Sequence, residues 1–187
     1  MSEPVNSKNA PMDPKTDETT PQQLHLACAQ GDAYGRALTH MTDAVANDGG
    51  EQRAGHYLIG YAVEEAEGMY EWANGQLVWR EAGEANLHLE ITVRDSGDGR
   101  FVPDVRVLAT LIDSDGWDIG SHEQPLIWHP MLYHYGRNWT VPADGEYTLR
   151  VSVDPPTFMR HDSVNGRRFI DRVEVEFTGV KVKRGTD

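Results

Sequence analysis

The stretch Leu87-His88-Leu89-Glu90-Ile91-Thr92-Val93-Arg94 alternates between apolar and polar side chains. Successive side chains of a β-strand point to opposite faces of a sheet, so this alternation predicts a half-buried strand. Its apolar residues would enter a core, while His88 and Glu90 would share the opposite face. Solvent alone would account for such a polar face, so these two residues do not by themselves establish a binding site.

Short segments with strand-like patterns continue from residue 57 to residue 182, separated by turns rich in Gly, Asp and Pro. The predicted strands cover residues 57–63, 76–80, 87–94, 105–112, 124–128, 139–141, 147–153 and 173–182. Pro155-Pro156 ends one of them, because proline cannot donate a hydrogen bond to a neighbouring strand. Many short strands predict a mainly β fold, an immunoglobulin-like antiparallel β-sandwich, with a closed barrel as the alternative.

Two different regions are predicted before this β domain, which would span residues 55–184. Residues 1–20 are polar and rich in Ser, Pro, Asn, Asp, Lys and Thr, a composition that predicts a disordered tail. Residues 21–50 contain a predicted helix, ended by Asp48-Gly49-Gly50. Residues spaced four, three and four apart give this helix one apolar face, namely Tyr34, Leu38, Met41 and Val45. Packing is the role expected for the helix.

The composition restricts the partners of the chain. Its 187 residues carry a formal net charge of -13, from 30 acidic and 17 basic residues. Negative charge repels nucleic acids and anionic membranes, so neither is expected to bind. The same charge would suit a halophilic protein, because salt screens self-repulsion. An ordinary acidic protein fits equally well, and folding measured against salt concentration would separate the two hypotheses.

Neither a secretion signal nor direct membrane insertion is expected from this chain. No segment approaches the roughly 20 apolar residues of a transmembrane helix. Residues 24–28 faintly resemble a lipoprotein cleavage site, but no apolar run precedes them. Cys28 is the one cysteine, so an intrachain disulfide and a cysteine-rich metal site are both excluded.

Three separated segments place a histidine beside another type of metal ligand. They are His88-Leu89-Glu90, residues 129–136 with Met131 and His134, and Met159-Arg160-His161-Asp162. Imidazole, thioether and carboxylate groups are the ligands of transition-metal sites. Pro130 and Gly136 predict a loop for the second segment. No segment is diagnostic alone, but one β domain could bring all three together, and this placement favours a metal site.

Aromatic side chains in and around the second segment leave other functions open. A carbohydrate- or protein-binding module would stack its ligand on Trp128, Tyr133, Tyr135 and Trp139. A metal-dependent enzyme of barrel type would instead use three histidines and Glu90 to hold iron with an open coordination position. Core packing or a dimer contact would also account for these aromatic residues.

The three histidine-bearing segments, taken in their order along the chain, resemble segments of the periplasmic iron-transport accessory family. The resemblance covers about residues 57–182. Leu87-His88-Leu89-Glu90 is similar to the family's His-x-Glu strand, and His134-Tyr135-Gly136-Arg137-Asn138 is similar to its His-Tyr-Gly-x-Asn motif. Asp154-Pro155-Pro156 and the later Arg160-His161 resemble the family's Pro-Pro and Arg-His segments.

This resemblance implies an exported, non-enzymatic β-sandwich that binds copper or other divalent metals and works beside a high-affinity iron permease. Such proteins are usually homodimers with metal sites near the dimer interface. The ligands implied for this chain are His88, Glu90, His134 and His161. Copper and iron are the metals that it favours.

A methionine ligand is implied less directly. The family's methionine lies farther before the His-Tyr-Gly motif than Met131 does, because the loop is shorter here. Either Met131 or His129 would fill that position, or neither would. Without a soft sulfur ligand, zinc or manganese becomes as plausible as copper.

Overall fold

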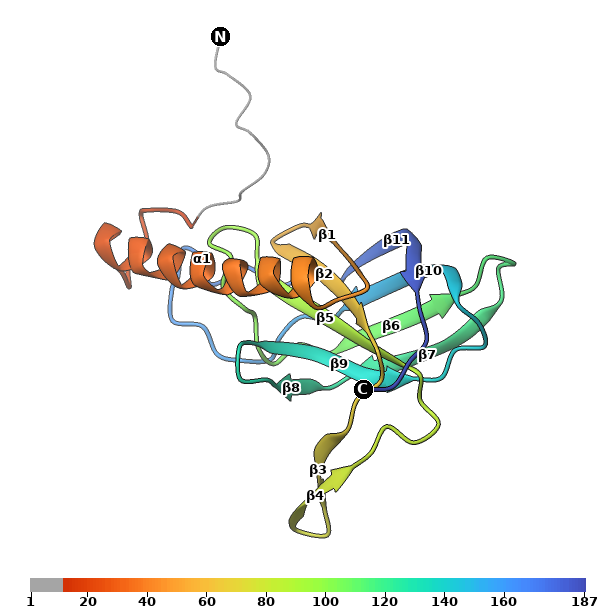
Figure 1. Cartoon of the computed structure of the whole chain (residues 1–187). Helices are drawn as coiled ribbons and strands as arrows, with labels where there is room; N and C mark the ends of the chain where they lie inside the picture. The colour runs from red at the N-terminus through yellow and green to blue at the C-terminus, as the bar shows by residue number, and fades with distance from the viewer. Residues whose placement is uncertain (1–11) are drawn as a thin grey trace.

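The computed structural model describes residues 12–187 (Figure 1). A helix, α1 (Pro21–Ala44), precedes all the strands. The strands are β1 (Asp48–Ala54), β2 (Tyr57–Glu64), β3 (Met69–Ala73), β4 (Gln76–Arg80), β5 (Leu87–Asp95), β6 (Val107–Ile112), β7 (Asp118–Gln124), β8 (Leu126–Trp128), β9 (Tyr133–Trp139), β10 (Gly145–Val153) and β11 (Val173–Val182).

Two antiparallel sheets face each other across the core. One is a 5-stranded sheet in the order β1-β2-β5-β9-β8, which we call the helix-side sheet, and the other is a 4-stranded sheet in the order β11-β10-β6-β7. Leu89 and Ile91 from β5 join Leu149 and Val151 from β10 in one buried apolar cluster. The predicted mainly β sandwich is therefore confirmed, and the closed barrel is not what forms.

Helix α1 lies across the outer surface of the helix-side sheet (Figure 1). It begins at a capping box, in which the Thr20 side chain and Gln23 satisfy each other's backbone N–H groups. Its predicted apolar face packs on the sheet through Tyr34, Leu38 and Met41, whereas Val45 is exposed at the end of the helix. The predicted packing role follows from these contacts.

A close approach between α1 and the turn after β5 requires glycine. A Cβ atom at Gly31 would lie 1.7 Å from the backbone oxygen of Asp98, so no other residue fits without moving the helix. The hydroxyl of Tyr34 also donates a hydrogen bond to the carbonyl of Tyr133, at the start of β9. These contacts fix α1 against both β5 and β9.

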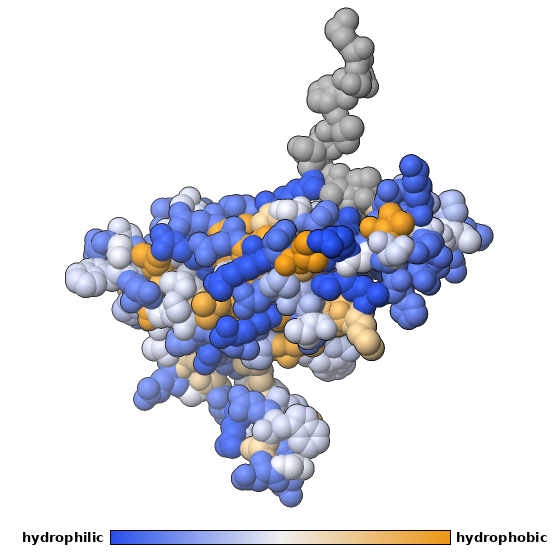
Figure 2. Space-filling view, turned by 180° about the vertical axis from the view of Figure 1, so that it is seen from behind, coloured by the Kyte–Doolittle hydropathy of each residue, from blue (hydrophilic) through white to orange (hydrophobic). Residues whose placement is uncertain are grey.

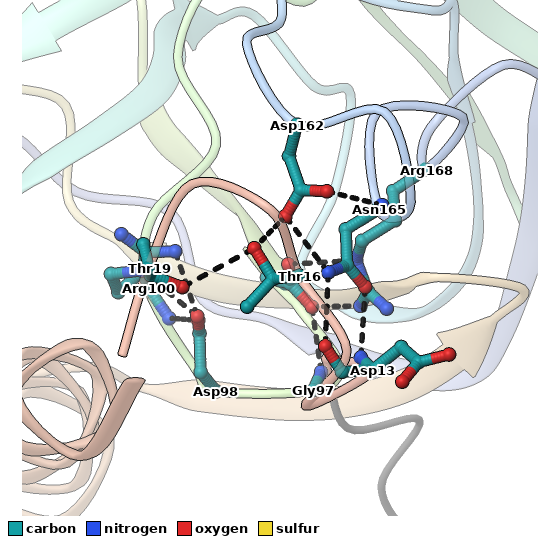
Figure 3. Close-up of polar contacts among 10 residues, drawn as sticks. Asp13, Thr16, Thr19, Gly97, Asp98, Arg100, Asp162, Asn165 and Arg168 are labelled. Carbon is teal, nitrogen blue, oxygen red and sulfur yellow. Dashed lines mark hydrogen bonds and ion pairs between the residues drawn. The ribbon is translucent and has the colours of Figure 1, made fainter. Parts of the chain in front are cut away.

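The described part of the region predicted as a disordered tail, residues 12–20, is held in place by hydrogen bonds. Residues 1–11 lie outside the described part of the chain. The Asp13 amide donates to Asn165 Oδ1 at 2.8 Å, and the Thr16 hydroxyl donates to Asp162 (Figure 3). Residues 12–19 are thus held against the loop that joins β10 to β11.

Local sequence patterns missed some strands. Residues 48–50, expected only to end the helix, open β1, which pairs with β2. Residues 133–136, predicted as a loop, belong to β9, which pairs with both β5 and β8. The loop prediction holds for residues 129–132 and was wrong for residues 133–136, because pairing with strands distant in sequence outweighs the local Gly signal.

The hairpin of β3 and β4 projects from the sandwich (Figure 1). Large apolar side chains on it are exposed, namely Tyr70, Trp72, Leu77 and Trp79. Elsewhere the face in Figure 2 is mainly hydrophilic, with apolar residues in separate small patches, as the acidic composition predicts. Among the described residues, no helix has both the length and the apolarity needed to cross a membrane.

Candidate metal centre

Three of the residues singled out in the sequence meet on the outer face of the helix-side sheet. His88 and Glu90 come from β5 and His134 comes from β9, and one ligand atom from each lies within 4.8 Å of the others. His134 Nε2 is 3.2 Å from Glu90 Oε1. The two imidazole rings are nearly perpendicular, with centroids 6.0 Å apart.

Strand geometry explains this convergence. His88 and Glu90 are two residues apart on β5, so both point outward, while the register pairs Glu90 with Gly136 on β9. His134 lies two residues from Gly136 and therefore shares that face. A Cβ atom at Gly136 would sit 3.2 Å from His88 Nε2 and 3.2 Å from His134 Cδ2. Glycine at this position keeps the space between the imidazoles open.

The orientation of His88 is set by Asn138. The Asn138 amide nitrogen donates to the Glu67 carbonyl at 2.7 Å, which turns the amide oxygen toward His88 Nδ1, 2.9 Å away. Because that oxygen only accepts, His88 carries its proton on Nδ1. The lone pair of Nε2 is then free and directed toward the site, an arrangement common to metal-bound histidines.

All three side chains are buried, and several of their polar atoms lack a partner. Relative exposure is 0% for His88, 3% for Glu90 and 1% for His134. Within the described residues, hydrogen-bond partners are missing for His88 Nε2, Glu90 Oε2 and both His134 nitrogens. Leaving a buried polar group unpaired costs about 1–3 kcal/mol. Nitrogen and carboxylate donors that converge without partners fit a bound transition-metal ion.

Burial also changes the protonation of the site. It raises the pKa of Glu90 to about 8, and the nearby carboxylates of Glu64 and Glu67 add to the effect. Burial lowers the pKa of His134 to about 3, with smaller contributions from the neighbouring His88 and His129. It lowers the pKa of His88 as well. At neutral pH both imidazoles are therefore ready to donate a lone pair, while Glu90 holds a proton.

The other predicted ligands lie elsewhere. The His161 side chain is 93% exposed, and its Nδ1 is 3.9 Å from Glu18 Oε2 rather than near the three converging residues. Met131 is 39% exposed, in the loop between β8 and β9. His129 accepts a hydrogen bond from the Met131 amide at 3.2 Å, and its ring centroid is 6.5 Å from that of His134. His129 therefore borders the site without joining it.

The aromatic residues of the alternative binding surface are divided between two environments. Tyr135 and Trp139 are buried in the sandwich core, whereas Trp128 and Tyr133 are exposed. Tyr133, Tyr135 and Trp139 share one face of β9, so the division follows their positions along the strand. Tyr133 is the first residue of β9, and Trp128 is the last residue of the edge strand β8. The four rings therefore do not form one stacking platform.

Glu67 was missed by the sequence patterns. Its Oε1 lies 3.7 Å from His88 Nε2, at the end of the segment that leads from β2 to the hairpin. No motif marks it, and only the fold brings it to the site. Asn138 belongs to the His-Tyr-Gly-x-Asn motif at residues 134–138, but its contact with His88 depends on the β5–β9 register.

Comparison with known proteins extends this description. Residues 49–181 match the sequence profile of the family described as Fe2+ transport protein. The chain belongs to this family. The match runs from the second residue of β1 into β11, so the resemblance noted in the sequence is confirmed. Helix α1 lies outside the matched range. A search among curated proteins finds no match.

Solved structures of similar fold include two proteins. A copper-bound variant of P19 from Campylobacter jejuni is 17% identical, with 72% of this chain and 94% of P19 covered and a TM-score of 0.60. A copper-bound variant of FetP from uropathogenic Escherichia coli is 20% identical, with 72% and 90% covered and a TM-score of 0.59. FetP as isolated is 21% identical, with 72% and 95% covered and a TM-score of 0.55. At such low sequence identity, the structural similarity establishes a common fold and nothing more.

Proposed function

We propose that this chain is a non-enzymatic metal-binding protein that serves iron or copper uptake. The observation that carries the proposal is the buried convergence of His88, Glu90 and His134, whose donor atoms lack hydrogen-bond partners among the described residues. Membership of the Fe2+ transport protein family favours transport over catalysis. The copper bound to the similar P19 and FetP structures supports a transition metal as cargo.

The donor set defines the chemistry of the proposed site. Neutral imidazoles from His88 and His134 suit copper, iron and zinc, while a carboxylate from Glu90 also suits manganese. Divalent copper binds a given nitrogen and oxygen site more tightly than iron or zinc does. Copper is therefore the ion expected to bind most tightly, and iron would need a higher free concentration.

The proposed partners follow from the family. An iron permease is the membrane protein that an uptake accessory protein would serve. The homodimer implied by the sequence resemblance remains a prediction, as do His161 and Met131 as ligands. The proposed ligand set is limited to the three residues that converge.

Titration of metal-free, full-length protein with copper(II) or iron(II) at neutral pH tests this function. We expect a His88→Ala/His134→Ala variant to lose binding of both ions. The matched control is His161→Ala, which removes an exposed imidazole and should bind as the wild type does. Unchanged binding in the double variant would refute the site, and loss in the control alone would reassign it to His161.

A further inference from the structure

Helix α1 gives this chain a feature that the matched part of the family lacks, because the family match begins after the helix. The helix lies over the helix-side sheet (Figure 1). It covers the face of the candidate centre, because Met41 clusters with Ala62, which pairs with Glu90. A cavity of about 510 Å³ lies between part of α1 and the sheet, and both Glu90 and Met41 line it. A thioether from the helix and a carboxylate from the centre thus face a common space.

Contacts of Met41 place it above β5. Its side chain is buried and packs with Ala62 and Leu132. Ala62 lies on β2, where it pairs with Glu90, and Leu132 precedes β9 on the other side of β5. A side chain that contacts both must cross over β5, beside Glu90.

Met41 differs from the other described methionines. Met131 and Met159 are exposed, and Met12 and Met69 are only partly buried and do not line this cavity. Gly31 and Tyr34 hold the helix against the turn after β5 and the start of β9. Met41 is therefore the buried methionine, among the described residues, that lines a common cavity with Glu90 of the centre.

We propose that Met41 supplies a thioether ligand to the metal, so that α1 completes the centre from within the same chain. This inference rests on the proposed function. Thioether sulfur is a soft ligand that selects copper(I), whereas the two imidazoles and the carboxylate also accept zinc, iron and manganese. Met41 thereby makes the site selective for copper in its reduced state.

Copper(I) binding to the full-length protein tests the inference, with Met41→Leu compared against Met131→Leu. Leucine has nearly the volume of methionine and keeps the packing, so both variants should fold. We expect Met41→Leu to lose the sulfur scatterer from the copper X-ray absorption spectrum. Its copper(I) affinity, measured by competition with a chromophoric chelator, should fall roughly tenfold or more. Zinc(II) affinity should stay unchanged, and Met131→Leu should match the wild type in every measurement.

The outcomes separate this inference from the proposed function. A wild-type spectrum without sulfur, or a sulfur signal that survives in Met41→Leu, overturns the role of Met41. If zinc(II) still binds in either case, the centre itself stands. Failure of the wild-type protein to bind zinc(II), copper(I) or copper(II) would overturn the centre and the inference together. A wild-type spectrum without sulfur overturns the role of Met41 even if a variant does not fold.

Discussion

The two faces of β5 are buried to the same degree but for different reasons. Leu89 and Ile91 point inward and belong to the apolar core, whereas His88 and Glu90 are equally buried on the opposite face. Glu90 there lines a cavity with residues of α1. The inner face gains free energy from burial, because its side chains contact other apolar groups. The outer face loses free energy, because His88 Nε2 and Glu90 Oε2 gave up water without gaining hydrogen bonds. Burial without partners, rather than burial itself, distinguishes the candidate site from the core.

Substitution of the inner face should have the largest effect on stability. Leu89→Ala removes a fully buried side chain and leaves a cavity, so we expect the free energy of unfolding to fall by about 2–5 kcal/mol. Urea unfolding of the metal-free protein would measure it. Metal affinity of the folded fraction should change little. A loss below 0.5 kcal/mol would show that the two faces do not differ in the way described.

On the outer face, an apolar substitution should have the opposite sign. Glu90→Leu removes a buried carboxyl with an unpaired oxygen, so we expect the metal-free protein to gain about 1–3 kcal/mol at pH 7. Metal binding should be lost at the same time. Thermal unfolding and copper(II) titration would measure the two effects. Glu90→Gln is the control, since it keeps a polar group in the same place and should not stabilise. Destabilisation by Glu90→Leu would contradict the contrast between the faces.

The orientation of the ligands can be tested separately from their presence. Asn138→Ala removes the acceptor that holds the proton of His88 on Nδ1, so Nε2 is no longer kept free. We expect metal affinity to weaken by about 10–100-fold, the usual effect of losing a partner behind a metal ligand. Copper(II) titration would measure it. The control is Thr140→Ala, two residues after Asn138, which removes a hydroxyl that donates to the Glu84 carbonyl and should leave affinity unchanged.

The sequence predicted which residues share each face of β5, because alternation is a local property. It predicted a half-buried strand, however, and both faces are buried. The position of His134 was less accessible. Pro130 and Gly136 indicated a loop, and only the pairing of β9 with β5 and β8 makes this segment a strand. The motif-based choice of His161 depended on where a long loop lies. That loop is held by residues 12–19, which local patterns described only as polar.

Helix α1 shows the same limit of local patterns. Its apolar face was visible in the spacing of Tyr34, Leu38 and Met41. The sequence did not show which surface this face covers, because that depends on the close fit of Gly31 to the turn after β5. The burial that shifts the pKa values of the site was therefore hidden as well.

The change in metal affinity expected per pH unit is the smallest of these effects, and Glu90 determines its sign. Folding raises the pKa of Glu90 to about 8, from the model-peptide value of 4.5. Between these values the folded, metal-free protein holds a proton that a carboxylate ligand must release. We therefore expect copper(II) binding at pH 7 to release about one proton, and affinity to rise by roughly tenfold per pH unit up to about pH 8.

Calorimetry in buffers of different ionisation enthalpy would count this proton. Above pH 8 the affinity should level off, because Glu90 is then already ionised. The pKa values of His88 and His134 are both lowered by burial, so both imidazoles are neutral between pH 7 and pH 8 and add no slope there. A Glu90→Gln variant should therefore bind more weakly but without this pH dependence. If its affinity still rose with pH, the titrating group would be another residue. The outer face of β5 would then be more accessible to water than its burial indicates.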